Sequence, residues 1–151
     1  MSEYHKQTTV FNDEESLVNA LVDVGYDRSV IEVHKNAVPL VDYVGRQTRY
    51  TDKVNGDRAN VIIRRNNIGY GSANDLGFKF NEETKTYDAF ISQYDSSAAH
   101  WGVGGTRFKK LKAAYAEHRG IKQAKSMGFK FLGKQVVNGK VQLKFVDPRV
   151  R

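Results

Sequence analysis

The chain has no cysteine, so it can form neither a disulfide framework nor a thiolate metal site, and it has no catalytic thiol. A reducing compartment fits this composition. No run of apolar residues approaches the roughly 20 that a membrane-spanning helix needs. The first 15 residues, MSEYHKQTTVFNDEE, are polar and acidic, unlike a secretory signal or an Arg-rich transit peptide. We therefore expect a cytoplasmic protein without membrane contact.

Motifs for metal binding and catalysis are also missing. The histidines are scattered and lack the spacing of a metal site such as H-E-x-x-H; they are His5, His34, His100 and His118. There is no Gly-x-Ser-x-Gly nucleophile elbow. The acidic run at 13–15 lies at a predicted helix start, where carboxylates favourably meet the helix dipole. The sequence predicts no catalytic residue, no metal and no cofactor, and a non-enzyme is favoured over an enzyme.

Acidic residues are scarce in the last third of the chain. The formal net charge is +7. Residues 1–100 carry 11 Lys and Arg against 15 Asp and Glu, a net charge of −4, whereas residues 101–151 carry 13 against 2, a net charge of +11. This asymmetry indicates a polyanionic partner, such as nucleic acid, a phosphorylated ligand or an acidic protein surface. The alternative is a solvated basic face that only keeps the protein soluble.

Three apolar-Gly-aromatic triplets, with glycines at 25, 77 and 128, mark the element boundaries. Two of them end predicted helices, at about 13–24 and 107–126, because apolar residues recur before them at helical intervals. Asn12 has capping-box spacing with Glu15, and Thr106 is a candidate N-cap. Gly25 and Gly128 then occupy C′ positions, where a left-handed conformation brings no Cβ clash.

The remaining patterns predict strands. LGFKFNEETKTYDAFISQY has the alternation of a hairpin with a turn at NEETK, and FLGKQVVNGKVQLKFV contains Asn138-Gly139, the strongest short hairpin signal. SVIEVH and ANVIIRR are predicted strands, VPLVDYVG is a weaker one, and GRQTRYTDKVNGDR is an exposed loop. At 151 residues we expect a single domain, 1–151, of the α+β class: an antiparallel sheet of four or more strands with two helices packed on one face.

Several of these segments together resemble the ycf thirty-five-like family, a hypothetical reading frame of chloroplasts that also occurs as a domain of unknown function in cyanobacteria and their phages. They include ALVDVGY at 20–26, NVIIRR at 60–65, DLGFKFNEETKTYDAF at 75–90 and Trp101. The resemblance spans nearly the whole chain and implies a small cytosolic or stromal fold without an established activity. His5 is displaced here from the second position, where that family usually has Ser-His, and residues 107–134 are more basic.

The basic last third holds the candidate site. In HWGVGGTRFKK, 100–110, a glycine-rich loop would let backbone amides approach an anion at a helix N-terminus. Trp101 either anchors this loop to the core or offers a stacking surface. The residues expected to bind nucleic acid or another anion are Arg107, Lys109, Lys110, Lys112, Arg119, Lys140 and Lys144.

Two functions stay open. The first is a small basic non-catalytic protein that associates with nucleic acid through its C-terminal third. Its contacts would be to phosphate, so binding would be insensitive to sequence and would weaken steeply with salt. The second is an accessory subunit that docks on a protein partner, without catalysis.

Overall fold

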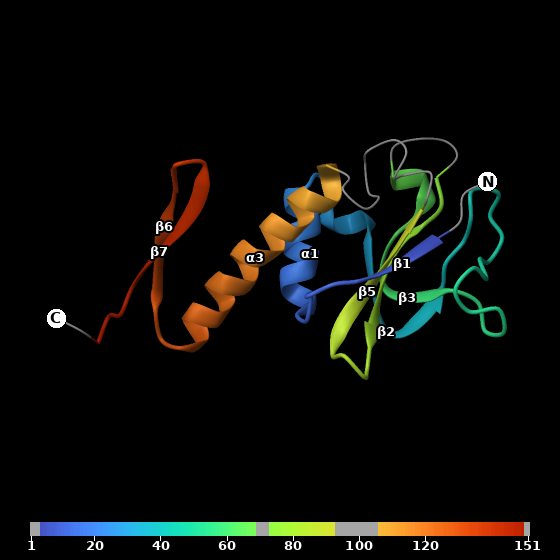
Figure 1. Cartoon of the computed structure of the whole chain (residues 1–151), viewed down its shortest axis with the longest axis horizontal. Helices are drawn as coiled ribbons and strands as arrows, with labels where there is room; N and C mark the ends of the chain where they lie inside the picture. Colours follow the sequence, from blue (N-terminus) through green and yellow to red (C-terminus); the bar gives the residue numbers. More distant parts are fainter. Residues whose placement is uncertain (1–3, 69–72, 93–105, 150–151) are drawn as a thin grey trace.

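The structure, a computed structural model, describes residues 4–68, 73–92 and 106–149. A five-stranded antiparallel sheet, a layer of two α-helices and a two-stranded ribbon follow one another along the long axis (Figure 1). The predicted α+β class is confirmed. The elements are, in chain order, β1 (Tyr4–Thr8), α1 (Glu14–Asp23), η1 (Arg28–Val30), β2 (Ile31–Pro39), β3 (Arg58–Ile63), η2 (Arg65–Asn67), β4 (Leu76–Asn81), β5 (Thr86–Ser92), α3 (Thr106–Ser126), β6 (Lys130–Val137) and β7 (Lys140–Val146).

The sheet has the strand order β1-β5-β4-β3-β2, and every neighbouring pair is antiparallel. The predicted hairpin forms β4 and β5, with Phe78 paired to Ala89. Strand β1 was not predicted, because its sequence YHKQT lacks the apolar alternation of a half-buried strand. It is held at the sheet edge by its pairing with β5, from Tyr4 opposite Ser92 to Thr8 opposite Asp88.

The main core lies between one sheet face and the two helices, which confirms the predicted arrangement (Figure 1). Phe11 lies at its centre, with its ring centroid 6.3 Å from those of Phe78 and Phe108 and 4.5 Å from that of Tyr115. These side chains come from the sheet, from α3 and from the segment before α1. The cluster therefore joins the sheet, α3 and the segment before α1. Burial of each large apolar side chain stabilises the fold by about 1.5–3 kcal/mol.

Both helices end in the same way. Gly25 has φ of +117° and Gly128 has φ of +90°. In each case the next residue donates its N–H to a carbonyl five residues back, Tyr26 to Leu21 at 3.2 Å and Phe129 to Ala124 at 3.0 Å. This is the Schellman motif, which satisfies carbonyls that the helix leaves without a partner. The predicted role of these two triplet glycines is confirmed.

The start of α1 differs from the prediction by one residue. The N-cap is Asp13 rather than Asn12, and its carboxylate accepts a hydrogen bond from the Ser16 N–H at 3.0 Å. Asn12 does not cap the helix, because its Oδ1 accepts a hydrogen bond from the Tyr115 hydroxyl at 2.9 Å. A tertiary contact therefore decides which of two adjacent candidates caps the helix.

The second sheet face is covered in part by the segment 40–57. Of the strand predicted for VPLVDYVG, only Val38 and Pro39 lie in a strand, as the end of β2, and the chain then leaves the sheet. Buried carboxylates hold this segment down: Asp57 accepts from two backbone N–H groups at 2.8 Å, and Asp75 accepts from the N–H of Val41 at 2.8 Å and from the Arg64 guanidinium at 2.9 Å. The loop predicted to be exposed thus has a buried end.

Gly77, the glycine of the middle triplet, has a different purpose. It lies within β4, where an added Cβ would be 2.8 Å from the Ala59 Cβ and 2.9 Å from the Leu40 Cδ2. Contacts this short do not occur between unstrained carbon atoms. The glycine is therefore required for the close approach of Leu40 to the sheet.

Replacing Gly77 with Ala should lower the free energy of unfolding by about 1–3 kcal/mol, because the added methyl group overpacks this contact. Gly120→Ala in α3 is the control. An added Cβ there would lie 3.5 Å from the Leu143 Cδ1, an ordinary contact, and alanine favours a helix over glycine by about 1 kcal/mol. Urea unfolding followed by circular dichroism measures both. Equal stability of Gly77→Ala and the unmodified protein would contradict the close-packing role.

Candidate nucleic-acid interface

Helix α3 carries the basic third of the chain away from the body of the protein, by which we mean the five-stranded sheet, α1 and the segments that join them. Its first half is anchored by four buried residues at helical spacing, Phe108, Leu111, Ala114 and Tyr115. Beyond Tyr115 no residue of α3 is fully buried. The helix continues through Gly120 without a break and ends at Ser126 beside the ribbon. The second half of α3 is thus an arm on which the ribbon is mounted (Figure 1).

The Tyr115 hydroxyl fixes the point from which this arm extends. It accepts hydrogen bonds from the N–H groups of Asn12 at 2.8 Å and Asp13 at 3.1 Å, and it donates to Asn12 Oδ1. These N–H groups lie at the start of α1, where a helix has donors without an intrahelical partner. The hydroxyl therefore ties the midpoint of α3 to the N-terminus of α1.

Several basic residues of α3 are engaged by the body. Lys122 Nζ lies 2.9 Å from Asp13 and 3.8 Å from Glu15, and the hydrogen bond to Asp13 raises the pKa of Lys122. His118 Nε2 lies 2.6 Å from the Asp23 carboxylate. The side of α3 that faces α1 consequently meets the acidic residues of α1, and part of the positive charge of α3 is matched within the protein.

The structure separates the predicted α3 residues into two groups. Arg107 donates to the Tyr26 hydroxyl at 3.0 Å and lies over its ring, and Arg119 Nε donates to Asn12 Oδ1 at 3.2 Å. The Lys112 ammonium lies 5.3 Å from the Phe108 ring centroid. Lys109 and Lys110, in contrast, are exposed. Arg107, Arg119 and Lys112 therefore have contacts within the protein, whereas Lys109 and Lys110 face solvent.

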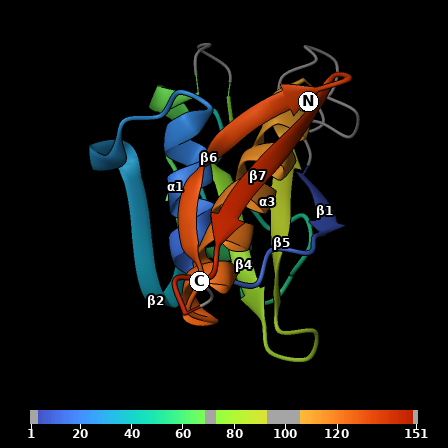
Figure 2. The ribbon, with the colours of Figure 1, turned by 90° about the vertical axis from the view of Figure 1, so that its left-hand side faces the viewer.

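Lys140 and Lys144 lie far from these residues, on the ribbon formed by β6 and β7 (Lys130–Val146). The predicted Asn138-Gly139 turn is confirmed: both residues have positive φ, 52° and 76°, as a type I′ turn requires. A bulge at Gly133, with φ of +149°, shifts the register between the ends of the ribbon. In the view of Figure 2 the ribbon lies in front of α3.

The two faces of the ribbon differ. The inner face, toward α3, carries Leu143, which lies over Gly120, and the paired rings of Phe131 and Phe145 at 5.5 Å. Lys134 also belongs to this face. Its Nζ lies 2.9 Å from the Glu117 carboxylate, and this hydrogen bond raises the pKa of Lys134. The outer face follows from the register and consists of Lys130, Gln135, Val137, Lys140, Gln142, Lys144 and Val146.

In the part of the chain that the structure describes, no carboxylate pairs with a lysine of the outer face. Within the described residues no ion pair or hydrogen bond engages Lys130, Lys140 or Lys144, and all three are exposed. The sequence from 130 to 146 contains no Asp or Glu. Lys130, Gln135 and Gln142 were not predicted as site residues. Their signal was the strand alternation, which places Gln135 and Gln142 on one face with Lys140 and Lys144. Lys130 joins this face once the bulge is known.

Apolar residues are exposed on the same ribbon. Leu132 is 60% exposed, Val136 is 70% exposed, and Val141, the cross-strand partner of Val136, is 52% exposed. A two-stranded ribbon is marginally stable in isolation, and α3 covers only the base of the inner face of this one. The free part of the inner face is therefore apolar, whereas the outer face is basic and amide-rich.

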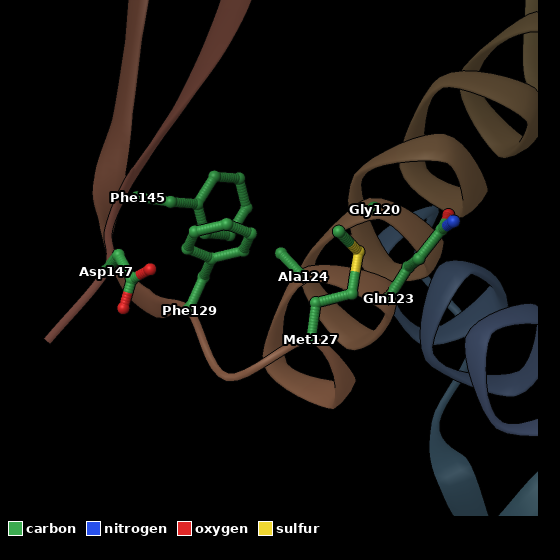
Figure 3. Close-up of a pocket in the computed structure, with 7 residues that line it drawn as sticks. All are labelled: Gly120, Gln123, Ala124, Met127, Phe129, Phe145 and Asp147. Carbon is green, nitrogen blue, oxygen red and sulfur yellow. The ribbon is translucent and has the colours of Figure 1, made fainter. Parts of the chain in front are cut away.

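A cavity of about 320 Å³ separates the base of the ribbon from α3 (Figure 3). Phe129 and Phe145 lie on one side of it, and Ala124 and Met127 on the other. The Asp147 carboxylate at its rim accepts hydrogen bonds from the Arg149 guanidinium at 2.8 and 3.0 Å. The described residues that line the cavity are mainly apolar, and the carboxylate of Asp147 is engaged by Arg149.

Other predicted features can be placed only in part. Trp101 and most of the glycine-rich loop, 100–105, lie outside the described residues. In the part of the chain that the structure describes, no three metal-ligating side chains converge. Over the same residues, neither α-helix combines the length and the hydropathy of a membrane span. Comparison with protein-family models, curated proteins and solved structures finds no match, so the function of the site rests on its own geometry.

Replacing Tyr115 with Phe should lower the free energy of unfolding by about 1–3 kcal/mol, because two partly buried N–H groups lose their acceptor. Tyr43→Phe is the control, since within the described residues no hydrogen bond to the Tyr43 hydroxyl is present. Thermal unfolding measures stability, and hydrogen exchange of the first turn of α1 should increase only in Tyr115→Phe. Unchanged exchange there would contradict the anchoring role.

Proposed function

We propose that the protein associates with nucleic acid through the outer face of the β6–β7 ribbon. The observation that carries this proposal is the group of exposed lysines on that face, Lys130, Lys140 and Lys144, without a carboxylate in the ribbon sequence. A polyanion neutralises such a face and releases counterions as it binds. Lys109 and Lys110, in the first turns of α3, supply further exposed positive charge.

The placement of the ribbon also supports this function. It stands beyond the helix layer, on the side of α3 away from the sheet, so a long polymer can reach its outer face without meeting the body (Figures 1 and 2). Lys140 and Lys144 are four residues apart on one strand, about 14 Å by the strand rise of 3.4 Å per residue. This spacing suits contacts to separate phosphates of a nucleic-acid backbone. Such contacts position a protein without reading sequence.

Replacing Lys130, Lys140 and Lys144 together with Gln should weaken binding to nucleic acid. It should also flatten the slope of log K against log salt concentration by about 0.9 for each duplex phosphate that the variant no longer neutralises. Fluorescence anisotropy with labelled DNA and RNA, single- and double-stranded, over a salt series measures both quantities. Absence of binding by the unmodified protein to all four probes at low salt would end the proposal.

The matched control replaces three exposed lysines of the body, Lys35, Lys53 and Lys85, with Gln. Both triple variants change the net charge equally, so a general charge effect would weaken them equally. We expect the control variant to bind almost as the unmodified protein does. An equal decrease in affinity in the two variants would contradict the assignment to the ribbon.

The exposed apolar residues favour a second candidate, an accessory subunit that docks on a protein partner. Val136 and Val141 form a cross-strand apolar pair that α3 does not cover. Exposed apolar groups on a projecting element are typical of surfaces that a partner buries. This candidate and nucleic-acid association use opposite faces of the ribbon, so separate variants can test them.

Under this second candidate, Val136→Ser with Val141→Ser should abolish capture of a partner from nuclease-treated lysate and leave nucleic-acid binding unchanged. The control is Val10→Ser with Val54→Ser, two exposed valines of the body. Affinity capture followed by mass spectrometry compares the variants. A partner retained equally by both double variants would contradict docking through the inner face.

A further inference from the structure

Two glutamines occupy the centre of the outer face of the ribbon. Gln135 and Gln142 are direct cross-strand partners, and Gln135 Nε2 donates to Gln142 Oε1 at 3.2 Å. The next pair on the same face toward the turn is Val137 with Lys140, and the next pair away from it is Gly133 with Lys144. The glutamine pair is thus flanked on both sides by a lysine. Opposite Lys144, the glycine leaves space for a ligand to approach the backbone.

The hydrogen bond between the two amides leaves each of them with further hydrogen-bond donors and acceptors. Gln135 keeps its Oε1 acceptor and one Nε2–H donor, and Gln142 keeps both Nε2–H donors and one acceptor site on Oε1. Both side chains are exposed, so these groups point to a ligand or to solvent. An acceptor beside a donor on one planar amide matches the N6–H donor and N7 acceptor that adenine presents in the major groove.

The shape of the ribbon favours duplex over single-stranded nucleic acid. A two-stranded β-ribbon fits the major groove of B-form DNA, whereas the major groove of RNA duplexes is too narrow for side chains to read. Single-strand binding without sequence preference depends on aromatic rings that stack on bases. The outer face has none: its aromatic neighbours Phe131 and Phe145 lie on the inner face.

We propose that the ribbon enters the major groove of double-stranded DNA, where Gln135 and Gln142 contact adenine edges while Lys140 and Lys144 contact the flanking phosphates. This inference rests on the proposed nucleic-acid association and adds base readout to it. The lysines supply the salt-dependent affinity, and the glutamines supply discrimination between bases.

The test uses the full chain and three 20-base-pair duplexes of equal charge. One has a central block of alternating A·T pairs, the second has the same sequence with 7-deazaadenine for adenine, and the third has only G·C pairs. Replacing N7 with carbon removes one major-groove acceptor and leaves the minor-groove edge and the backbone charge intact. We expect the unmodified protein to bind the first duplex about tenfold more tightly than the second.

Gln135→Ala with Gln142→Ala should bind the first two duplexes equally, with the salt slope of the unmodified protein. Gln123→Ala, an exposed glutamine of α3, is the control and should keep the discrimination. Equal binding of the unmodified protein to the first two duplexes overturns base readout but leaves phosphate association in place. Tighter binding to the single strand of the first duplex also overturns it. Absence of binding to any probe overturns the proposed function as well.

Discussion

The hydrogen bonds of the Tyr115 hydroxyl are the constraint on which the position of the ribbon depends. This oxygen accepts from two N–H groups at the start of α1 and donates to Asn12, at 2.8 to 3.1 Å. Tyr115 is also the last buried residue of α3 and its ring contacts Phe11 in the core. The second half of α3 and the ribbon extend beyond this point, so their point of attachment to the rest of the protein is fixed here.

Electrostatic pairing along α3 explains why the strongly basic third of the chain does not behave as one uniform surface. Asp13 at the start of α1 forms an ion pair with Lys122, and Glu117 forms one with Lys134 of the ribbon. These exposed pairs contribute little to stability. Their consequence is spatial: positive charge without a partner within the described residues is left on the outer face of the ribbon and on the exposed side of α3.

The ribbon is amphipathic, which relates the two candidate functions to each other. Strand alternation with an Asn-Gly turn gives it an outer face of lysines and glutamines and an inner face that is apolar. Its base is held by Leu143 over Gly120, and its tip exposes Val136 and Val141. A polyanion on one face and a protein on the other are therefore compatible, since neither needs the residues of the other.

The sequence by itself determined the features that depend on local backbone preferences. The Schellman ends at Gly25 and Gly128, the Asn138-Gly139 turn and the β4–β5 hairpin require only glycine's tolerance of positive φ and the period of two in a strand. The basic composition of the last third and the placement of Lys140 and Lys144 on the solvent side of a hairpin are sequence properties of the same kind.

Only the tertiary structure decided the rest, because long-range contacts override local signals. Asp13 caps α1 since Tyr115 occupies Asn12, and Gly77 is needed because Leu40 packs against it from the segment 40–57. The same holds for the site: nothing local distinguishes Arg119, which is held by Asn12, from Lys140, which is free of any described partner. Which charges are available to a ligand depends on partners about a hundred residues away in the chain, and these become neighbours only when the chain folds.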